Sequence, residues 1–251
     1  MAILIAACAV LSSVEAVVPL FQYRRGRLRR AVPNLILAVG VVLTNVACAS
    51  MTASLSAFVV REHFGLFGGM RSHPSLLLVM GVAALDLCAY FAHLLLHKMR
   101  WGWKFHRVHH SELEVDVTTA FRQHPGETLW RVLWQAFGIA LFGLPFWVVP
   151  LYLSVSSLNA LLEHANVRMS NGFDGWLRML IVTPNMHKIH HSRLVIETDS
   201  NYSNIFSLWD RLFCTHTQEV NYRGLRYGLD GFDQSREQNL TALIGAPFRT
   251  S

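Results

Sequence analysis

Four long apolar blocks constrain the fold of this chain more than any other feature of its sequence. The blocks lie at about residues 2–21, 35–60, 74–97 and 130–164, and they contain very few charged side chains. A helix needs about 20 apolar residues to cross a hydrocarbon core of about 30 Å, and each block is long enough. With 52% hydrophobic and 15% charged residues in 251, the sequence predicts an all-α integral membrane protein with about four transmembrane or re-entrant helices.

A cluster of arginines after the first block predicts the orientation of these helices. The cluster comprises Arg24, Arg25, Arg27, Arg29 and Arg30. Lys and Arg accumulate in short cytoplasmic loops, so we expect this loop inside the cell and the N-terminus outside. The first block has neither a basic leader nor a small-residue cleavage site and is expected to remain as an anchor. The second block then leads outward, and the third returns and brings His93 and His97 to the cytoplasmic side.

The fourth block is interrupted by Pro145 and Pro150, which predicts a hairpin rather than one straight helix. Two arms of about 15 residues each would enter the bilayer, fold back and return His164 to the cytoplasmic side. One continuous span would place His164 across the bilayer from the other histidines. We therefore expect a single domain, residues 1–251, whose segments at about 98–128 and 165–251 form a histidine-rich helical cap in the cytosol.

The charge and the cysteines exclude two other classes of protein. The net charge is +6, but the basic residues flank the apolar blocks or lie among the histidines, which favours anionic lipid headgroups over nucleic acid. Cys8, Cys48 and Cys88 lie inside apolar blocks, Cys214 is isolated, and the sequence has no CxxC pair. Neither a disulfide framework nor a thiolate zinc site is therefore expected.

Histidines recur at helical spacing in three boxes, and this spacing indicates a metal site. The boxes are His93-x-x-x-His97, His106-x-x-His109-His110 and His187-x-x-His190-His191, and His164 precedes the third box. Side chains three or four residues apart share a helix face, roughly 5 to 6 Å apart, so two of them can bind one ion. These imidazoles exceed the about four to six ligands of a single ion, so we predict two metals. His63, His73 and His216 are interpreted as ordinary core or interfacial histidines.

Asp86 shares a helical stripe with Tyr90, His93 and His97 and lies about 10 Å deeper in the third block than His93. A carboxylate inside a membrane needs a partner or a task. One interpretation is that Asp86 accepts a hydrogen bond from a ligand imidazole and so fixes its tautomer. The other is a helix-packing hydrogen bond from Tyr or Ser of a neighbouring helix.

His124 and Asn201 are further candidates for the site. His124 stands in the run Gln-His-Pro-Gly-Glu, and it is either an additional ligand or a residue that supports one. The run lacks the second glycine of a haem-binding His-Pro-Gly-Gly loop, so haem is rejected. A zinc-protease site is also rejected, because no box contains the glutamate of an HExxH motif.

The ordered motifs of the chain resemble one family. The boxes HLLLH, HRVHH and HKIHH, with VTTAFRQHPGE, NALLEHANVR, TPNMHKIHHS and ETDSNYSNIFSLWDRLF, resemble the sterol desaturase and fatty acid hydroxylase superfamily of membrane di-iron oxygenases, specifically its short bacterial members. The likeness runs from about Asp86 to Cys214. Some members have a further histidine where this chain has Arg168, and a glycine often stands where it has Ser203.

The resemblance implies about four transmembrane helices under a cytosolic histidine cap, two Fe ions, O2 and electrons from a separate donor. It also implies a location in a bacterial inner membrane. The implied ligands are His93, His97, His106, His109, His110, His164, His187, His190 and His191.

Two ferrous ions, O2 and two electrons can supply the strong oxidant that cleavage of an unactivated C–H bond requires. We therefore expect a lipid hydroxylase or desaturase acting on a fatty acyl chain, sterol, carotenoid or ether lipid, with hydroxylation favoured. The alternative is a metal-binding membrane protein without catalysis, such as a zinc carrier or sensor, because histidine also binds zinc. Transport favours ionisable residues at mid-membrane depth along several spans, whereas only Glu15 and Asp86 lie at such depth within these blocks.

The electron donor is expected to be a separate protein of the cytochrome or ferredoxin type, because the sequence shows no fused cytochrome, ferredoxin or flavin domain. Basic residues around the second and third boxes predict its docking face. They are Arg100, Lys104, Arg107 and Lys188.

Overall fold

The computed structural model describes residues 2–23, 26–69, 73–218 and 222–249. Within these ranges the regular secondary structure is helical, apart from two isolated β-bridges, Pro19 with Val167 and Ile181 with Phe206. The longer helices are α1 (Ala2–Val17), α2 (Arg27–Arg61), α3 (Pro74–Lys98), α4 (Arg100–His110), α5 (Pro125–Phe142) and α6 (Val148–His164). The short helices are α7 (Asn171–Leu177), α8 (Pro184–His190), α9 (Val195–Thr198), α10 (Leu208–Leu212) and α11 (Leu240–Gly245). The 3-10 helices are Val117–Phe121, Tyr222–Gly224 and Ala246–Phe248. The predicted all-α class is confirmed for the described residues.

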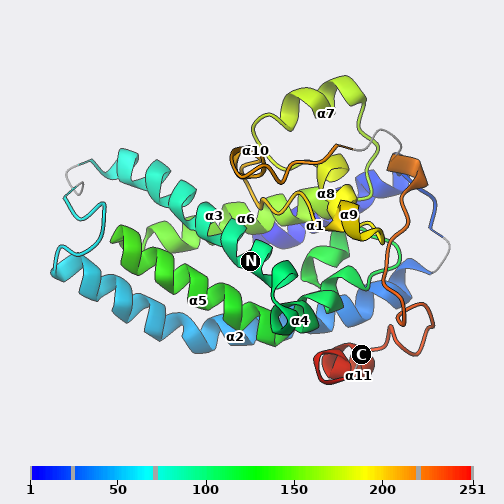
Figure 1. Cartoon of the computed structure of the whole chain (residues 1–251), viewed down its shortest axis with the longest axis horizontal. Helices are drawn as coiled ribbons and strands as arrows, with labels where there is room; N and C mark the ends of the chain where they lie inside the picture. The colour runs from blue at the N-terminus through cyan, green and yellow to red at the C-terminus, as the bar shows by residue number, and fades with distance from the viewer. Residues whose placement is uncertain (1, 24–25, 70–72, 219–221, 250–251) are drawn as a thin grey trace.

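Helices α2, α3, α5 and α6 form the elongated part at the left of Figure 1, and the short helices gather to the right. Helix α5 packs against α2 and α3, and α3 also packs against α6. Leu77, Leu85, Ile139 and Val148 are among the buried side chains at their centre. This packing fixes the end of α3, from which His93 and His97 project.

Helices α2 and α3 are the two described helices that are long and apolar enough to cross a membrane, judged by length and composition. Helix α3 coincides with the predicted block within one residue. Helix α2 has 35 residues and contains the predicted block 35–60, but it begins eight residues earlier, at Arg27. Many of its apolar side chains are exposed, for example Leu43 at 63% and Val46 at 66%. Such a contiguous apolar surface is typical of contact with a membrane or another protein.

Helix α1 is shorter than the first predicted block. It has 16 residues, fewer than the about 20 that a full crossing needs. Beyond Val17 the chain pairs with the segment after α6, where Arg168 N donates to Val18 O at 2.9 Å and Leu20 N donates to Asn166 O at 3.2 Å. The predicted helix over 2–21 is therefore wrong after Val17, because these backbone groups bond to a distant segment instead.

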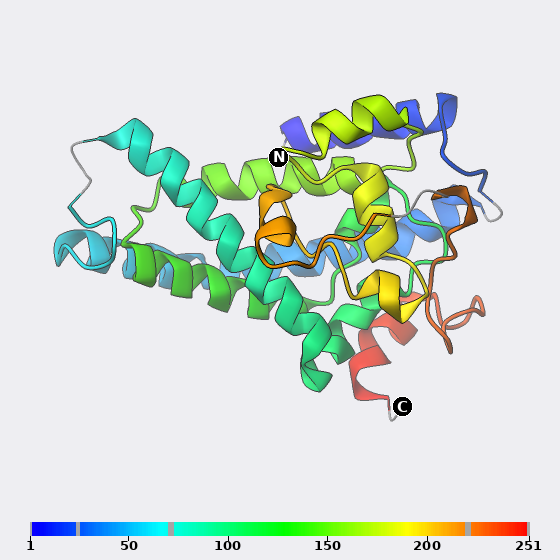
Figure 2. The ribbon, with the colours of Figure 1, turned by 45° about the horizontal axis from the view of Figure 1, so that its top comes forward.

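The fourth block is divided into two arms by residues 143–147. Gly143 ends α5 in the left-handed region, with φ 71°, and a Cβ there would lie 2.2 Å from the Phe64 carbonyl oxygen, so glycine is required. Figure 1 shows α5 running toward the left end of the molecule and α6 running back. Figure 2 shows the same reversal from another side. It brings His164, the last residue of α6, to α4, where His164 Nε2 lies 3.1 Å from His109 Nε2.

Candidate metal centre

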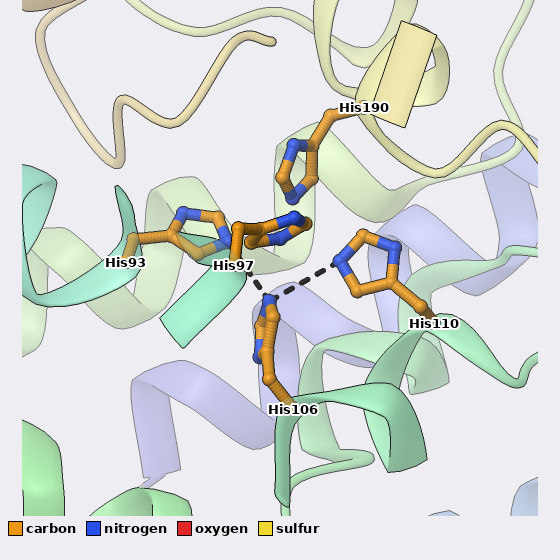
Figure 3. A group of neighbouring side chains, drawn as sticks. All are labelled: His93, His97, His106, His110 and His190. Carbon is orange, nitrogen blue, oxygen red and sulfur yellow. Dashed lines mark hydrogen bonds between the residues drawn. The ribbon is translucent and has the colours of Figure 1, made fainter. Parts of the chain in front are cut away.

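The eight box histidines and His164 meet at one end of the long helices. They project from the end of α3, from α4, from the end of α6 and from α8, with His191 directly after α8. The first histidine group consists of His93, His97, His106, His110 and His190, and the second histidine group consists of His109, His164, His187 and His191. Within each group the candidate ligand atoms lie within 4.8 Å of one another, and Figure 3 shows the rings of the first group directed toward a common centre.

Adjacent histidines belong to different groups. On α4, His110 joins the first group and His109 the second, and at the end of α8 His190 and His191 are divided in the same way. Neighbouring side chains on an α-helix point about 100° apart, because the helix has 3.6 residues per turn. Each of these two helices therefore contributes to both groups and fixes one relative to the other.

A tight turn brings the second box back onto the first. Met99 separates α3 from α4, and a Cβ on Gly102 would lie 3.0 Å from the Leu96 Cα. Glycine therefore permits the close approach of the two helices. The result is that His106 Nε2 lies 3.0 Å from His93 Nε2, although the two residues belong to different helices.

Each imidazole of the first histidine group has an oxygen beside its outer nitrogen, Nδ1. These Nδ1 atoms lie 2.8 Å from Tyr202 O for His93, 2.7 Å from Ser200 O for His190, 3.3 Å from Thr198 Oγ1 for His110, 3.0 Å from Glu127 Oε1 for His106 and 3.6 Å from Asp199 Oδ1 for His97. For His93 and His190 the neighbouring oxygen is a carbonyl that can only accept a hydrogen bond, so the proton lies on Nδ1 and Nε2 keeps its lone pair. His106 Nδ1 makes no hydrogen bond with Glu127 despite the short distance, and 3.6 Å is too long for a hydrogen bond between His97 and Asp199. The Thr198 hydroxyl donates to the His190 carbonyl and thus also acts as an acceptor toward His110.

The inner nitrogens of the first group converge. His106 Nε2 lies 3.2 Å from His110 Nε2, in addition to its contact with His93. His97 Nε2 and His190 Nε2 are buried and have no hydrogen-bond partner among the described residues. Lone pairs facing one another at this distance repel, unless a cation lies between them. Nitrogens bound at about 2.1 Å to one ion are about 3 Å apart when their bonds are perpendicular, so these atoms fit a metal ion.

The inner nitrogens of the second group converge on His164. Its Nε2 lies 3.0 Å from His187 Nε2 and 3.1 Å from the Nε2 atoms of His109 and His191. The outer nitrogens are held less completely than in the first group. His164 Nδ1 lies 2.7 Å from Ala160 O and His109 Nδ1 lies 3.3 Å from Arg122 O. Nδ1 of His187 and of His191 has no hydrogen-bond partner among the described residues.

Burial keeps the cap histidines neutral. It lowers the pKa of His106, His109, His110, His187, His190 and His191 well below the usual value for imidazole, and the neighbouring imidazoles lower it further. Neutral imidazole is the form that binds metals. Outside the groups, the nearby His97 imidazole and the Lys98 ammonium group lower the pKa of Asp199, so this carboxylate is ionised.

Three carboxylates near the groups were not predicted from the sequence. Glu127 and Asp199 face outer nitrogens of the first group, and Arg131 holds Glu127 from the other side at 2.8 Å. Glu163 lies against the second group, with its Oε1 3.7 Å from His187 Nε2. The spacing of Glu127 and Arg131, four residues apart on one helix, was the available signal for one of them.

Asp86 is placed away from the imidazoles. Its carboxylate accepts hydrogen bonds from the backbone N–H groups of Ile205 and Phe206, at 3.0 and 2.9 Å, and from the Trp209 indole at 2.9 Å. The Asn204 side chain donates to it as well, at 3.2 Å. In this arrangement Asp86 fixes residues 204–209 to the middle of α3.

His124 lies in neither histidine group. Its Nδ1 accepts from Gly126 N at 3.0 Å and so caps the start of α5, and its Nε2 donates to the Ile244 carbonyl at 3.2 Å. Asn201 is fully buried between the two residues whose carbonyls face His190 and His93. It contacts the site through the backbone of its neighbours.

The basic docking face must be corrected at two positions. Arg107 is partly buried, and its guanidinium donates to the Ala246 carbonyl. Lys188 is completely buried, and its ammonium group donates to the carbonyls of His164 and Ala165 at 2.8 and 2.9 Å. Burial lowers the pKa of Lys188 to about 8. Its polar sequence context suggested a surface residue, but α8 is a short helix packed on all sides, so Lys188 caps α6 instead of facing a partner.

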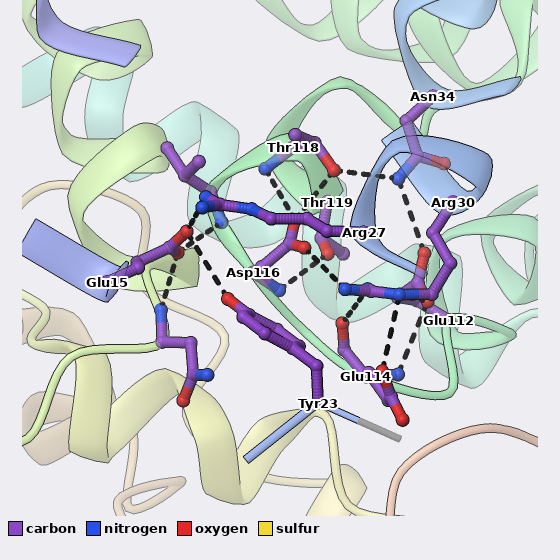
Figure 4. A network of polar contacts seen from close by, with 12 residues as sticks. Glu15, Tyr23, Arg27, Arg30, Asn34, Glu112, Glu114, Asp116, Thr118 and Thr119 are labelled. Carbon is purple, nitrogen blue, oxygen red and sulfur yellow. Dashed lines mark hydrogen bonds and ion pairs between the residues drawn. The ribbon is translucent and has the colours of Figure 1, made fainter. Parts of the chain in front are cut away.

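A buried polar network supports the loop after the second box (Figure 4). Arg30, at the start of α2, contacts Asp116, Glu114 and Glu112 at 3.0, 3.3 and 3.6 Å. These contacts were not anticipated for the arginine cluster, of which Arg24 and Arg25 lie outside the described residues. The network ties the first turn of α2 to the segment that follows His110.

Glu15 forms the second half of this network. Its carboxylate is fully buried, accepts from Val117 N and Asn166 N at 2.7 Å each, and pairs with Arg27. One side chain of α1 thus joins three distant parts of the chain.

The fold and the site define an all-helical protein with two adjoining clusters of buried histidines and two apolar helices of membrane-spanning length. The fatty acid hydroxylase family profile matches residues 78–215, more than half of the chain. The chain therefore belongs to the fatty acid hydroxylase family, and the resemblance seen in its motifs is confirmed.

Individual relatives are similar over the same part of the chain. The chain is 32% identical to an ornithine lipid hydroxylase of Rhizobium tropici over 140 residues, 55% of this chain and 40% of that protein. It is 28% identical to the alkylglycerol monooxygenase of Homo sapiens over 156 residues, 61% and 34% of the two chains. It is 32% identical to methylsterol monooxygenase 1 of Gallus gallus over 143 residues, 55% and 45%. The matches thus span less than half the length of these relatives. No solved structure matches the chain.

Proposed function

We propose that this protein is an O2-dependent di-iron lipid hydroxylase or desaturase, with hydroxylation favoured. The observation that carries the proposal is the convergence of nine Nε2 atoms into two adjoining groups, several of them with lone pairs directed inward by oxygens at Nδ1. Imidazole suits iron as well as zinc or copper. Family membership supports iron and O2 as the cofactors, and the relatives named as hydroxylases or monooxygenases support hydroxylation.

The residues of the chain prepare the site for this chemistry. Iron held by the two groups would supply, with O2 and two electrons, the oxidant that cleaves a C–H bond. Tyr202, Ser200 and Glu127 orient the ligand rings, and burial of the rings keeps bulk water from the centre. Ligands held in place in this way need no rearrangement when a metal binds.

A membrane lipid is the proposed substrate class. The relatives are named for an ornithine lipid, an alkylglycerol and a methylsterol. We therefore propose a fatty acyl, ether-lipid, sterol or carotenoid substrate. The exposed apolar side chains of α2, such as Leu35, Val39 and Leu43, suit contact with hydrocarbon. We place α2 and α3 across a bacterial inner membrane with the histidine end on the cytoplasmic side, because basic residues begin α2 at that end.

Iron content and lipid products test the proposal together. Protein purified in detergent and loaded anaerobically with Fe²⁺ should hold about two irons per chain by mass spectrometry. Cells supplied with ¹⁸O2 should contain an ¹⁸O-labelled lipid that is absent with His187→Ala and present with the control His63→Ala. Iron far below one per chain would refute the di-iron centre. Metal binding with unchanged lipids in both variants would favour the non-catalytic zinc carrier or sensor.

The separate electron donor is proposed to dock on the exposed basic face of α4 and the end of α3. Lys98, Arg100 and Lys104 are exposed there. Between them and the first histidine group stands the partly buried Trp103, whose ring centroid lies 5.1 Å from that of His97 and 5.4 Å from that of His110. An acidic one-electron carrier of the cytochrome or ferredoxin type complements this charge.

Charge reversal tests the docking face. A reduced plant-type ferredoxin serves as the probe. Arg100→Glu combined with Lys104→Glu should slow iron reduction about tenfold or more at low salt, because the attraction between the basic face and the acidic ferredoxin accelerates their association. Arg61→Glu, at the opposite end of α2, is the matched control and should leave the rate unchanged. Equal rates for the double variant and the wild type would remove this face as the docking site.

A further inference from the structure

One short segment orients most of the first histidine group. Residues 198–202 place an oxygen beside Nδ1 of four of its five imidazoles. The oxygens are Thr198 Oγ1 for His110, Asp199 Oδ1 for His97, Ser200 O for His190 and Tyr202 O for His93. The rings belong to α3, α4 and α8, so a single stretch of chain determines the direction of ligands from three helices.

Asn201 gives this segment its shape. Its φ is 54°, in the left-handed region that L-residues other than asparagine, aspartate and glycine rarely adopt. The turn separates the Ser200 carbonyl from the Tyr202 carbonyl and sets their relative directions. The hydrogen bonds from His190 and His93, at 2.7 and 2.8 Å, both depend on those directions.

The side chain of Asn201 fixes the turn on its other side. Its amide nitrogen donates to the carbonyls of Met186 and Thr217 at 3.1 and 2.9 Å, and its oxygen accepts from Thr217 N at 3.0 Å. Its backbone N–H donates to Thr215 O at 2.9 Å. All hydrogen-bonding groups of the side chain are used to hold backbone, so the residue is not free to bind an ion itself.

We propose that Asn201 is the positioning residue of the first histidine group and that it acts through its left-handed backbone, without contacting the metal. The proposal rests on the proposed metal centre. It assigns Asn201 to one ion only, because the outer nitrogens of the second group that have acceptors use Ala160 O and Arg122 O, outside the segment 198–202. Disturbing Asn201 should therefore weaken the first ion and spare the second.

Two substitutions separate the backbone from the side chain. Asn201→Ala removes the side-chain hydrogen bonds to Met186 and Thr217 and disfavours the positive φ. Asn201→Gly removes the same hydrogen bonds but adopts that φ readily. Loss of a residue that supports ligands typically weakens metal binding about 10- to 100-fold, and we expect this for Asn201→Ala at the first site. We expect a smaller loss, at most about tenfold, for Asn201→Gly.

The protein is loaded with Fe²⁺ and equilibrated with increasing concentrations of a chelator, and the iron that remains bound is measured. Anaerobic Mössbauer spectra then distinguish the two sites. His97→Ala and His187→Ala provide reference spectra for damage to the first and the second group. His63→Ala is the matched control, because His63 also has a positive φ, of 52°, but lies in an exposed loop. It should retain both ions. Thermal unfolding of each apoprotein reports whether the variant folds.

Selective loss of the first-site signal in Asn201→Ala, with Asn201→Gly in between, supports the proposal. Wild-type affinity at both sites in Asn201→Ala overturns it, as does equal weakening of both sites. If Asn201→Ala does not fold, Asn201→Gly decides: a loss of at most about tenfold that is confined to the first site supports the proposal, and equal weakening of both sites overturns it. A wild-type protein that binds no metal would instead overturn the metal centre, so the two failures are distinguishable.

Discussion

Within 3.6 Å, the outer nitrogens of the first histidine group face two carboxylates, two carbonyls and a hydroxyl, whereas those of the second group face two carbonyls, with the Glu163 carboxylate 3.8 Å from His164 Nδ1. Among the described residues, Nδ1 of His187 and of His191 makes no hydrogen bond, and in the first group the same holds for His106 Nδ1, which lies 3.0 Å from the Glu127 carboxylate. A carboxylate beside Nδ1 makes an imidazole a stronger ligand and limits its rotation. We therefore expect unequal sites, with the first ion bound more tightly and the second released more readily.

Removal of a central ligand should give the largest effect. His164→Ala deletes the Nε2 that lies within 3.1 Å of three other second-group nitrogens. We expect loss of the second ion and a fall in lipid product of more than about 100-fold, beyond the effect of residues that only support ligands. Metal analysis and labelled-product assays measure both. His124→Ala, which removes an imidazole that caps a helix, should keep both ions, and loss of metal there would contradict the division into groups.

Asp199→Asn tests the charge beside the first group. The substitution removes the negative charge facing His97, and we expect the first ion to bind about 10- to 100-fold more weakly while the second is unchanged. Chelator competition gives both affinities. Asp230→Asn, which removes a fully exposed partner of Arg193, serves as the control and should alter neither.

Glu127→Gln should affect both metal and stability. It removes the charge beside His106 and leaves Arg131 without its buried partner. We expect about tenfold weaker binding at the first site, and a decrease in the free energy of unfolding of the apoprotein of about 1 to 3 kcal/mol. Chelator competition and denaturant unfolding provide the two values. A variant that is less stable but binds iron normally would show that Glu127 is only structural.

Glu163→Gln should have the smallest effect on metal binding. It tests most directly whether the first and second histidine groups differ in their dependence on a carboxylate. Glu163 lies 3.7 Å from His187 Nε2 and 3.8 Å from His164 Nδ1, so it forms no hydrogen bond with either ring. We expect less than tenfold weaker binding at the second site, below the range for a direct contact with a ligand. An effect as large as that of Asp199→Asn would mean that the second group also depends on a carboxylate, and the proposed inequality would fail.

Periodicity predicted the parts of the fold that depend on helix geometry. Block 74–97 became α3 almost to the residue, since a proline begins it and apolar residues fill it. Of the two prolines that interrupt the fourth block, Pro145 lies in the break between α5 and α6, whereas Pro150 lies in the first turn of α6. The first block was too long, because pairing of residues 18–20 with residues 166–168 is a contact between distant parts of the sequence.

Histidine spacing indicated which residues meet, but not what holds them. The oxygens of Ser200 and Tyr202 that face His190 and His93 belong to the backbone, and residue type carries no sign of them. The sequence around Lys188 is as polar as that around an exposed lysine. Only the packing around α8 shows that Lys188 is buried. Glu127 and Asp199 were missed because the histidines that they face, His106 and His97, belong to other segments of the chain.

The bonds of Glu15 constrain how the chain matures during synthesis. This carboxylate leaves the ribosome long before one of its hydrogen-bond donors exists, since the Asn166 amide follows it by 151 residues. At about 5 to 20 residues per second, the delay is roughly 8 to 30 s. During this delay Glu15 can pair with Arg27, which lies 12 residues further along the chain, but the hydrogen bond that joins α1 to Asn166 can form only after α6 has been made.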